Sequence, residues 1–116
     1  LAPVIAAGTL KVLEMLSQST AWRDRLWANT VFYAGAMRAA GFDLPNDGQH
    51  PIVPIMLGEA AVAQKLAADL LDRGVYAVGF FFPVVPQGQA RVRTQISAAH
   101  TAEDLRLAVA AFAACR

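Results

Sequence analysis

The segment from Gly79 to His100 constrains the fold of this chain more than any other. It joins an aromatic run, a loop with two prolines and a stretch whose side chains alternate in character. The alternation predicts a strand over residues 91–97 with two different faces. One face carries Val92, Thr94 and Ile96, and the other carries Arg91, Arg93 and Gln95. A guanidinium held on such a strand is a fixed fork that can bind a carboxylate or a phosphate.

Apolar spacing and turn residues predict the remaining elements. Helices are expected over residues 3–17, 20–40, 59–73 and from 101 onward, with strands over 52–57 and 75–82 and a loop over 43–51. The first helix and the strand 75–82 are so apolar that both are expected to be buried on more than one side. Pro54 lacks an N–H, so its strand should lie at a sheet edge or turn that nitrogen away from a partner. This order predicts an α/β fold, an α+β sandwich in which helices cover a small three-stranded sheet.

Capping residues mark the ends of the predicted helices. Ser19 or Thr20 can cap the second helix. Gly41 and Gly74 are suited to the left-handed conformation that ends a helix. Thr101 followed by Asp104 resembles a capping box that opens the last helix.

Composition limits the chain to one domain and excludes several classes of function. The 116 residues are 56% hydrophobic and 16% charged, and much of the apolar excess is alanine, which predicts closely packed helices or a surface that is buried elsewhere. We expect a surface that is buried elsewhere, which would make the chain a piece of a larger subunit. Its first residues resemble the interior of a secondary-structure element rather than a signal peptide. A net charge of +1 predicts no binding to nucleic acid, and the lack of a long apolar run predicts no membrane span. Cys115 is the only cysteine, which excludes an intrachain disulfide and suits a reducing compartment.

Arg93 is the strongest candidate for a functional side chain, as an anchor for a carboxylate or phosphate, although a surface ion pair would also explain it. Arg91 is expected to be a solvated charge at the mouth of the strand. His100 could be a general base, but a histidine at a strand-to-helix junction more often binds backbone groups. His50 is expected to be solvated, and the spacing of the two histidines predicts no metal site.

The lysines and the helical aromatic residues have plainer interpretations. Lys11 and Lys65 are expected to form ion pairs with Glu14 and Asp69 within their helices, so neither resembles a desolvated Schiff-base lysine. The aromatic residues of the second helix are expected to lie in the core or on a face between subunits. They are Trp22, Trp27, Phe32 and Tyr33.

Three stretches together resemble a known family over essentially the whole chain. They are GFFFPVVPQGQAR from Gly79 to Arg91, RDRLWAN at residues 23–29, and Leu10 to Met15. They are similar to the C-terminal part of the pyridoxal-phosphate-dependent α-oxoamine synthases, which have the aspartate-aminotransferase fold. The aromatic run with its proline loop is typical of the glycine C-acetyltransferase branch of that family.

The resemblance implies a function, partners and one site residue. It implies a homodimer that uses pyridoxal 5′-phosphate to condense glycine with acetyl-CoA, a step of threonine catabolism, in the bacterial cytoplasm or the mitochondrion. Arg93 would bind the substrate carboxylate, and no comparable role passes to Arg91. The Schiff-base lysine and the other cofactor-binding residues of the family would lie upstream. The chain is then expected to be the C-terminal small domain, with residues 1–41 leading from the large domain and 52–116 as an α/β core. Alone it is expected to bind no cofactor and to be inactive.

A different class of protein also fits the residues. A stand-alone α+β regulatory or interaction domain could use Arg91 and Arg93 to bind a small anionic effector.

Overall fold

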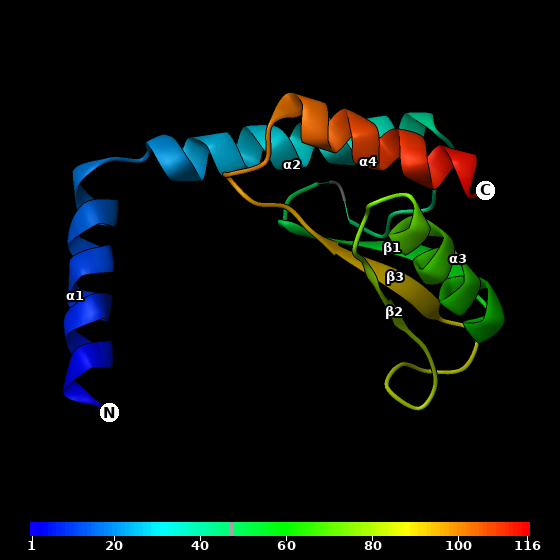
Figure 1. The fold of residues 1–116 in the computed structure, drawn as a ribbon, viewed down its shortest axis with the longest axis horizontal. Helices are drawn as coiled ribbons and strands as arrows, with labels where there is room; N and C mark the ends of the chain where they lie inside the picture. The colour runs from blue at the N-terminus through cyan, green and yellow to red at the C-terminus, as the bar shows by residue number, and fades with distance from the viewer. Residues whose placement is uncertain (47) are drawn as a thin grey trace.

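The computed structural model describes residues 1–46 and 48–116. Its elements follow in the order α1 (Pro3–Gln18), α2 (Ala21–Ala39), β1 (Ile52–Gly58), α3 (Ala60–Asp72), β2 (Val78–Phe80), β3 (Ala90–Gln95) and α4 (Ala102–Ala114) (Figure 1). The strands form one antiparallel sheet in the order β1-β3-β2. The predicted sandwich with a small three-stranded sheet is confirmed. Asp47, part of the predicted loop 43–51, lies outside the described residues.

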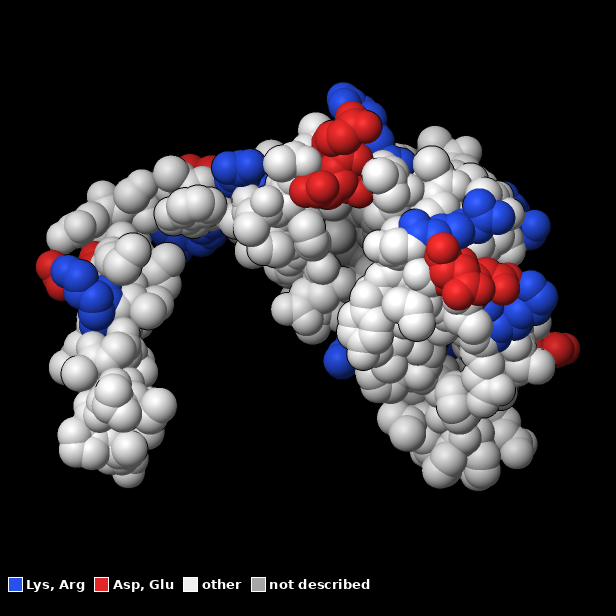
Figure 2. Space-filling model, in the orientation of Figure 1, with Lys and Arg blue, Asp and Glu red and all other residues white. Residues whose placement is uncertain are grey.

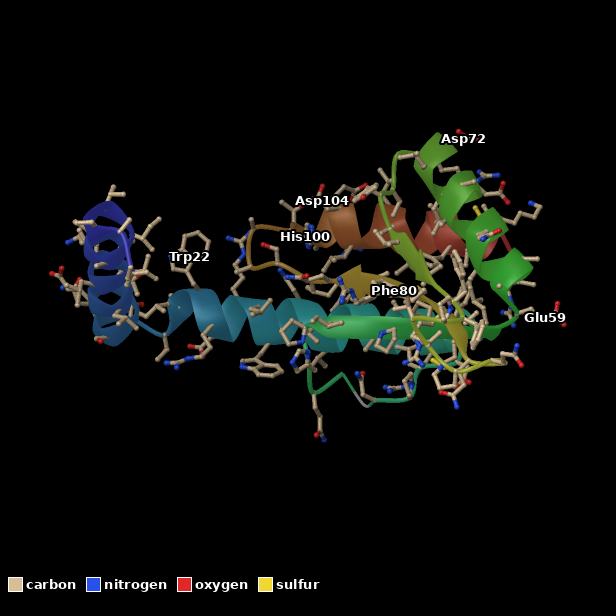
Figure 3. The ribbon with its side chains drawn as sticks, turned by 90° about the horizontal axis from the view of Figure 1, so that it is seen from below. Trp22, Glu59, Asp72, Phe80, His100 and Asp104 are labelled. Carbon is tan, nitrogen blue, oxygen red and sulfur yellow. The ribbon has the colours of Figure 1, made fainter. Side chains whose placement is uncertain are left out.

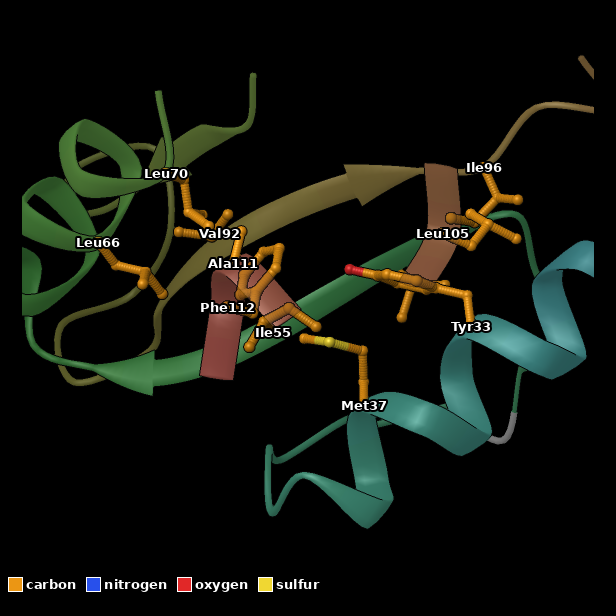
Figure 4. Close-up of a cluster of buried hydrophobic side chains, with 11 residues drawn as sticks. Tyr33, Met37, Ile55, Leu66, Leu70, Val92, Ile96, Leu105, Ala111 and Phe112 are labelled. Carbon is orange, nitrogen blue, oxygen red and sulfur yellow. The ribbon is translucent and has the colours of Figure 1, made fainter. Parts of the chain in front are cut away.

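The helices cover only one face of the sheet. Four apolar side chains that point to this covered face are almost inaccessible to solvent; they are Val53 and Ile55 of β1, Val92 of β3 and Ile96 directly after β3. They pack against apolar side chains from three helices, namely Tyr33 and Met37 of α2, Leu66 and Leu70 of α3, and Leu105 and Phe112 of α4 (Figure 4). Complete burial of one such side chain stabilises a protein by about 1.5–3 kcal/mol, so this layer holds the domain together.

The opposite face of the sheet, which we call the open face, has no buried side chain among the described residues. Its members are Ile52, Pro54, Met56, Val78, Phe80, Arg91, Arg93 and Gln95. The predicted alternation of the arginine-bearing strand is therefore confirmed, because Val92 and Ile96 are buried while the arginines point away from the core.

Pro54 lies on an edge strand, as predicted, because β1 pairs only with β3 within the sheet. On the outer side of β1, the N–H of Met56 donates to the carbonyl of Asp43 at 3.0 Å. Proline thus occupies a strand whose second side has no full partner strand.

The prediction of a strand over residues 75–82 that is buried on both faces is wrong in both its length and its burial. Only Val78–Phe80 is strand, and it forms the second edge of the sheet, where Val78 is 41% exposed. The N–H of Val75 donates to the carbonyl of Leu70 at 2.9 Å, so the first residues of the stretch complete the end of α3. The N–H of Val84 donates to the carbonyl of Phe81 at 2.9 Å, so the last residues begin a turn.

Helix α1 has the predicted extent, but the prediction that it is buried on more than one side is wrong. None of its residues is buried, and the helix projects away from the rest of the molecule (Figure 1). The radius of gyration is accordingly 16.4 Å, against about 13 Å for a compact domain of this length. The apolar side chains of α1 therefore lie outside the hydrophobic core of the described chain.

The predicted helix ends are confirmed at both glycines and at the last helix. Gly41 and Gly74 have φ angles of +88° and +83°, in the region that other residues rarely adopt. Thr101 and Asp104 form a complete capping box at the start of α4. At α2 the hydroxyl of Ser19 accepts from the N–H of Ala21 at 3.1 Å, while the Thr20 side chain caps nothing.

We expect Thr101→Ala to lower the free energy of unfolding by about 1 kcal/mol, because the N–H of Asp104 loses its acceptor. Urea denaturation followed by circular dichroism measures this change. Thr101→Ser, which keeps the hydroxyl, is the control and should retain most of the stability. Equal loss in both variants would contradict a capping role.

The same cap predicts a dependence on pH. The backbone N–H of Thr101, and then its hydroxyl, lower the pKa of Asp104 below its ordinary value of 3.8. A carboxylate with a lowered pKa stabilises the fold above its unfolded pKa, and this contribution is lost as the pH falls through the folded value. The difference in unfolding free energy between the wild type and Asp104→Ala should therefore shrink as the pH falls below about 4. A difference that is constant from pH 7 to pH 2 would contradict this account.

Candidate functional site

Arg93 lies at the centre of the open face. It occupies the middle strand, opposite Pro54 of β1 and Val78 of β2. Its guanidinium carbon is 4.6 Å from the centroid of the Phe80 ring. Within the described residues no hydrogen bond or ion pair occupies its N–H groups. The alternative of a surface ion pair therefore does not describe Arg93 in this structure.

Arg91 differs from Arg93 although both point to the same face. Its Nε–H donates to the carbonyl of Gln89 at 3.2 Å, and its Nη2 lies 3.5 Å from the side-chain oxygen of the same residue. The guanidinium is thus tied to the start of its own strand. The structure therefore leaves Arg93 as the arginine whose fork is available to a ligand.

The charges around Arg93 favour an anion. The open face carries two arginines and no Asp or Glu among its members. Elsewhere acidic and basic side chains are interspersed, as the view of Figure 2 shows. An anion at Arg93 would meet no competing carboxylate from this face.

The Arg93 side chain is exposed in this chain. A cavity of about 590 Å³ lies away from Arg93 and is lined in part by Tyr33, Tyr76, Thr94 and His100. Arg93 does not border it. Small-molecule sites are usually concave and enclose most of their ligand, so Arg93 needs a further wall opposite the sheet to complete such a site.

His100 binds the backbone of the connection between β3 and α4. Its Nδ1 accepts from the N–H of Ser97 at 3.0 Å. The side-chain amide of Asn29 donates to the carbonyls of Ser97 and His100 at 3.0 and 2.9 Å. These bonds fasten the connection between β3 and α4 to α2, and Figure 3 shows His100 close to the start of α4. The prediction that His100 binds backbone groups is confirmed. His50 likewise accepts from the N–H of Ile52 at 3.1 Å.

The sequence did not predict the hydrogen bonds that Asn29 makes to the connection between β3 and α4. It lies 68 and 71 residues from the two carbonyls that it bonds. No local pattern signals such a contact, because a polar residue on an amphipathic helix ordinarily faces solvent.

The lysines of this chain do not fit a pyridoxal-phosphate site. Lys11 and Lys65 are exposed and form the predicted ion pairs with Glu14 and Asp69. The hydrogen bond and charge of Asp69 raise the pKa of Lys65. A Schiff-base lysine needs the reverse, since the amine must lose its proton to act as a nucleophile. No step of chemistry on that cofactor can therefore be assigned to these residues.

The aromatic residues of α2 divide between core and surface. Tyr33 is buried in the core, and its burial raises its pKa to about 12, so it is no acid or base near neutral pH. Trp22, Trp27 and Phe32 are exposed on this chain. Their surface is available for contact with another part of a protein.

The described residues hold no group of three or more His, Cys, Asp or Glu side chains that could bind a metal ion. No described helix is both long enough and apolar enough to cross a bilayer.

The chain matches the model of a known protein family over nearly its whole length. It belongs to the aminotransferase class I and II family, whose model matches residues 1–112. It is 55% identical over 112 residues to 2-amino-3-ketobutyrate coenzyme A ligase of Escherichia coli K12, a match that covers 97% of this chain and 28% of that protein. The chain thus spans little more than a quarter of this curated relative. The resemblance inferred from the sequence is confirmed.

Solved structures share the fold. The 8-amino-7-oxononanoate synthase of Francisella tularensis superposes with a TM-score of 0.83 over 98% of this chain and 33% of that one, at 24% identity. Serine palmitoyltransferase from S. paucimobilis, solved with bound PLP-myriocin, gives a TM-score of 0.75 over 80% of this chain and 24% of that one, at 32% identity. The three-stranded sheet with its helices therefore recurs within larger proteins.

We expect His100→Ala to destabilise the protein by about 1 kcal/mol, because the N–H of Ser97 loses its acceptor. Asn29→Ala should cost a similar amount, since it leaves two carbonyls with one partner fewer. Chemical denaturation measures both changes. A His100→Ala protein of unchanged stability would contradict the structural role.

Proposed function

We propose that this chain forms the C-terminal, substrate-binding part of a pyridoxal-phosphate-dependent acyltransferase. The complete enzyme condenses glycine with acetyl-CoA to give 2-amino-3-oxobutanoate and CoA. The observation that carries the proposal is the free guanidinium of Arg93 on an open sheet face, in a chain 55% identical to a 2-amino-3-ketobutyrate coenzyme A ligase. Family membership supports the cofactor, and the PLP compound bound to serine palmitoyltransferase supports it further.

Arg93 binds the carboxylate of glycine through two parallel N–H···O bonds. The planar fork matches the two carboxylate oxygens, so it fixes the orientation of the amino acid as well as its position. Holding the amino acid in one orientation keeps its Cα–H bond aligned for removal of the proton, which lowers the entropic part of the barrier. The cofactor, when bound, supplies the electron sink for this reaction.

The rest of the active site comes from outside this chain. The exposed lysine pairs of this chain support placing the cofactor-bearing lysine in another part of the protein. The exposure of Arg93 on the open face supports a second wall supplied by that part or by a second subunit of a homodimer. We expect the 116-residue chain alone to bind no pyridoxal phosphate and to be inactive. Its location in the bacterial cytoplasm or in a mitochondrion stays a prediction.

In the complete enzyme, Arg93→Ala should lower kcat/KM for glycine roughly ten- to 150-fold, since a hydrogen bond to a charged group contributes about 1.5–3 kcal/mol. Arg93→Lys should fail to restore it, because a point charge cannot replace the bidentate fork. Steady-state kinetics with glycine as the varied substrate measure both effects. Arg91→Ala is the matched control on the same strand and should change the KM for glycine less than about threefold.

Two results would contradict the proposal. One is an Arg93→Ala enzyme with wild-type glycine kinetics, which would exclude the arginine as the carboxylate anchor. The other is acyltransferase activity of the 116-residue chain after addition of pyridoxal phosphate, which would show that the chain carries its own cofactor site.

A further inference from the structure

Phe80 holds a defined place beside Arg93 on the open face. It is opposite Arg91 in the register of β2 and β3, which makes it the diagonal neighbour of Arg93. Diagonal positions in an antiparallel pair lie within reach of an aromatic ring and a long side chain. The guanidinium carbon of Arg93 lies 4.6 Å from the ring centroid, within the range of a cation–π contact.

Among the described residues, the Phe80 ring is the side-chain partner of the Arg93 guanidinium. Within the described part of the chain Arg93 has no ion pair or hydrogen bond, whereas Arg91 is tied to Gln89. An arginine side chain loses much rotamer freedom when it is fixed in one position, so a free Arg93 would sample many orientations. Contact with Phe80 restricts this sampling before a ligand arrives.

An aromatic partner suits an arginine that must bind an anion. A carboxylate partner would occupy the N–H groups of the fork and compete with the ligand. A ring contacts the flat face of the guanidinium, and the five N–H donors lie in the plane of that group. The contact therefore positions the fork while it leaves the fork's donors available.

The backbone of β2 fixes where the ring lies. Gly79 points to the covered face, where a Cβ added to it would lie 3.4 Å from the carbonyl oxygen of Ala63 in α3. Helix α3 therefore backs β2 closely at the residue before Phe80. Figure 3 shows Phe80 on this strand, which crosses the sheet beside β3.

We propose that Phe80 is a positioning residue that holds the Arg93 guanidinium in the orientation that binds the substrate carboxylate. This inference rests on the proposed function of Arg93. Phe80 itself touches no reacting atom. Its loss should weaken the binding of glycine without affecting the binding of acetyl-CoA.

The test compares ring-deleting with ring-retaining variants of the complete enzyme. Phe80→Leu and Phe80→Met keep an apolar side chain and should raise both the KM and the calorimetric Kd for glycine about three- to thirtyfold. Phe80→Tyr keeps the ring and should stay within about twofold of the wild type. The KM for acetyl-CoA should stay within about twofold in all three variants. Phe32→Leu is the matched control, because Phe32 lies under another arginine, Arg106, at 5.8 Å.

A double-mutant cycle separates this proposal from that for Arg93. In an Arg93→Ala background, Phe80→Leu should have little further effect on the Kd for glycine. A full effect in that background would overturn the positioning role, as would wild-type glycine binding in Phe80→Leu and Phe80→Met. A parallel rise in both KM values would show a general structural role and overturn it too. If Arg93→Ala alone leaves glycine binding unchanged, the proposed function fails, and the positioning role fails with it.

Discussion

The packing of one sheet face against three helices is the constraint on which the rest of this structure depends. Side chains of a strand alternate between faces, so burial of Val92 and Ile96 forces Arg91 and Arg93 to the other side. A slip of one residue in the register would place both guanidinium groups in the core and expose the apolar residues. The cost of burying unpaired charges makes this alternative inaccessible. The core therefore fixes the direction in which the arginines point.

Features that depend on local chemistry could be predicted from the sequence. The alternation of β3, the edge position of Pro54 and the capping box at Thr101 each follow from a few neighbouring residues. Features that depend on distant partners could not. The amide of Asn29 finds its acceptors about 70 residues away, and the contact of Phe80 with Arg93 requires the register of two strands.

The errors in predicted burial share one physical origin. Helix α1 and the stretch 75–82 are apolar enough to be buried on several sides, yet no residue of α1 is buried and Val78 is exposed in the described chain. Apolar composition predicts that a surface will be covered, but it does not say by which chain. Both regions lie in a chain that spans 28% of its Escherichia coli relative. Their exposed surface supports the proposal that further parts of a larger enzyme cover them.

The two arginines of β3 show how neighbours on one strand can acquire different properties. Both side chains leave the sheet on the same face, two residues apart. The carbonyl and side chain of Gln89 occupy donors of Arg91, whereas the ring of Phe80 contacts Arg93 without taking a donor. A guanidinium whose N–H groups are hydrogen-bonded has fewer donors left for a ligand. A guanidinium that contacts a ring through its flat face keeps its N–H donors for an anion. The chemistry of the partner therefore separates the arginine whose donors are partly occupied from the arginine whose donors stay available.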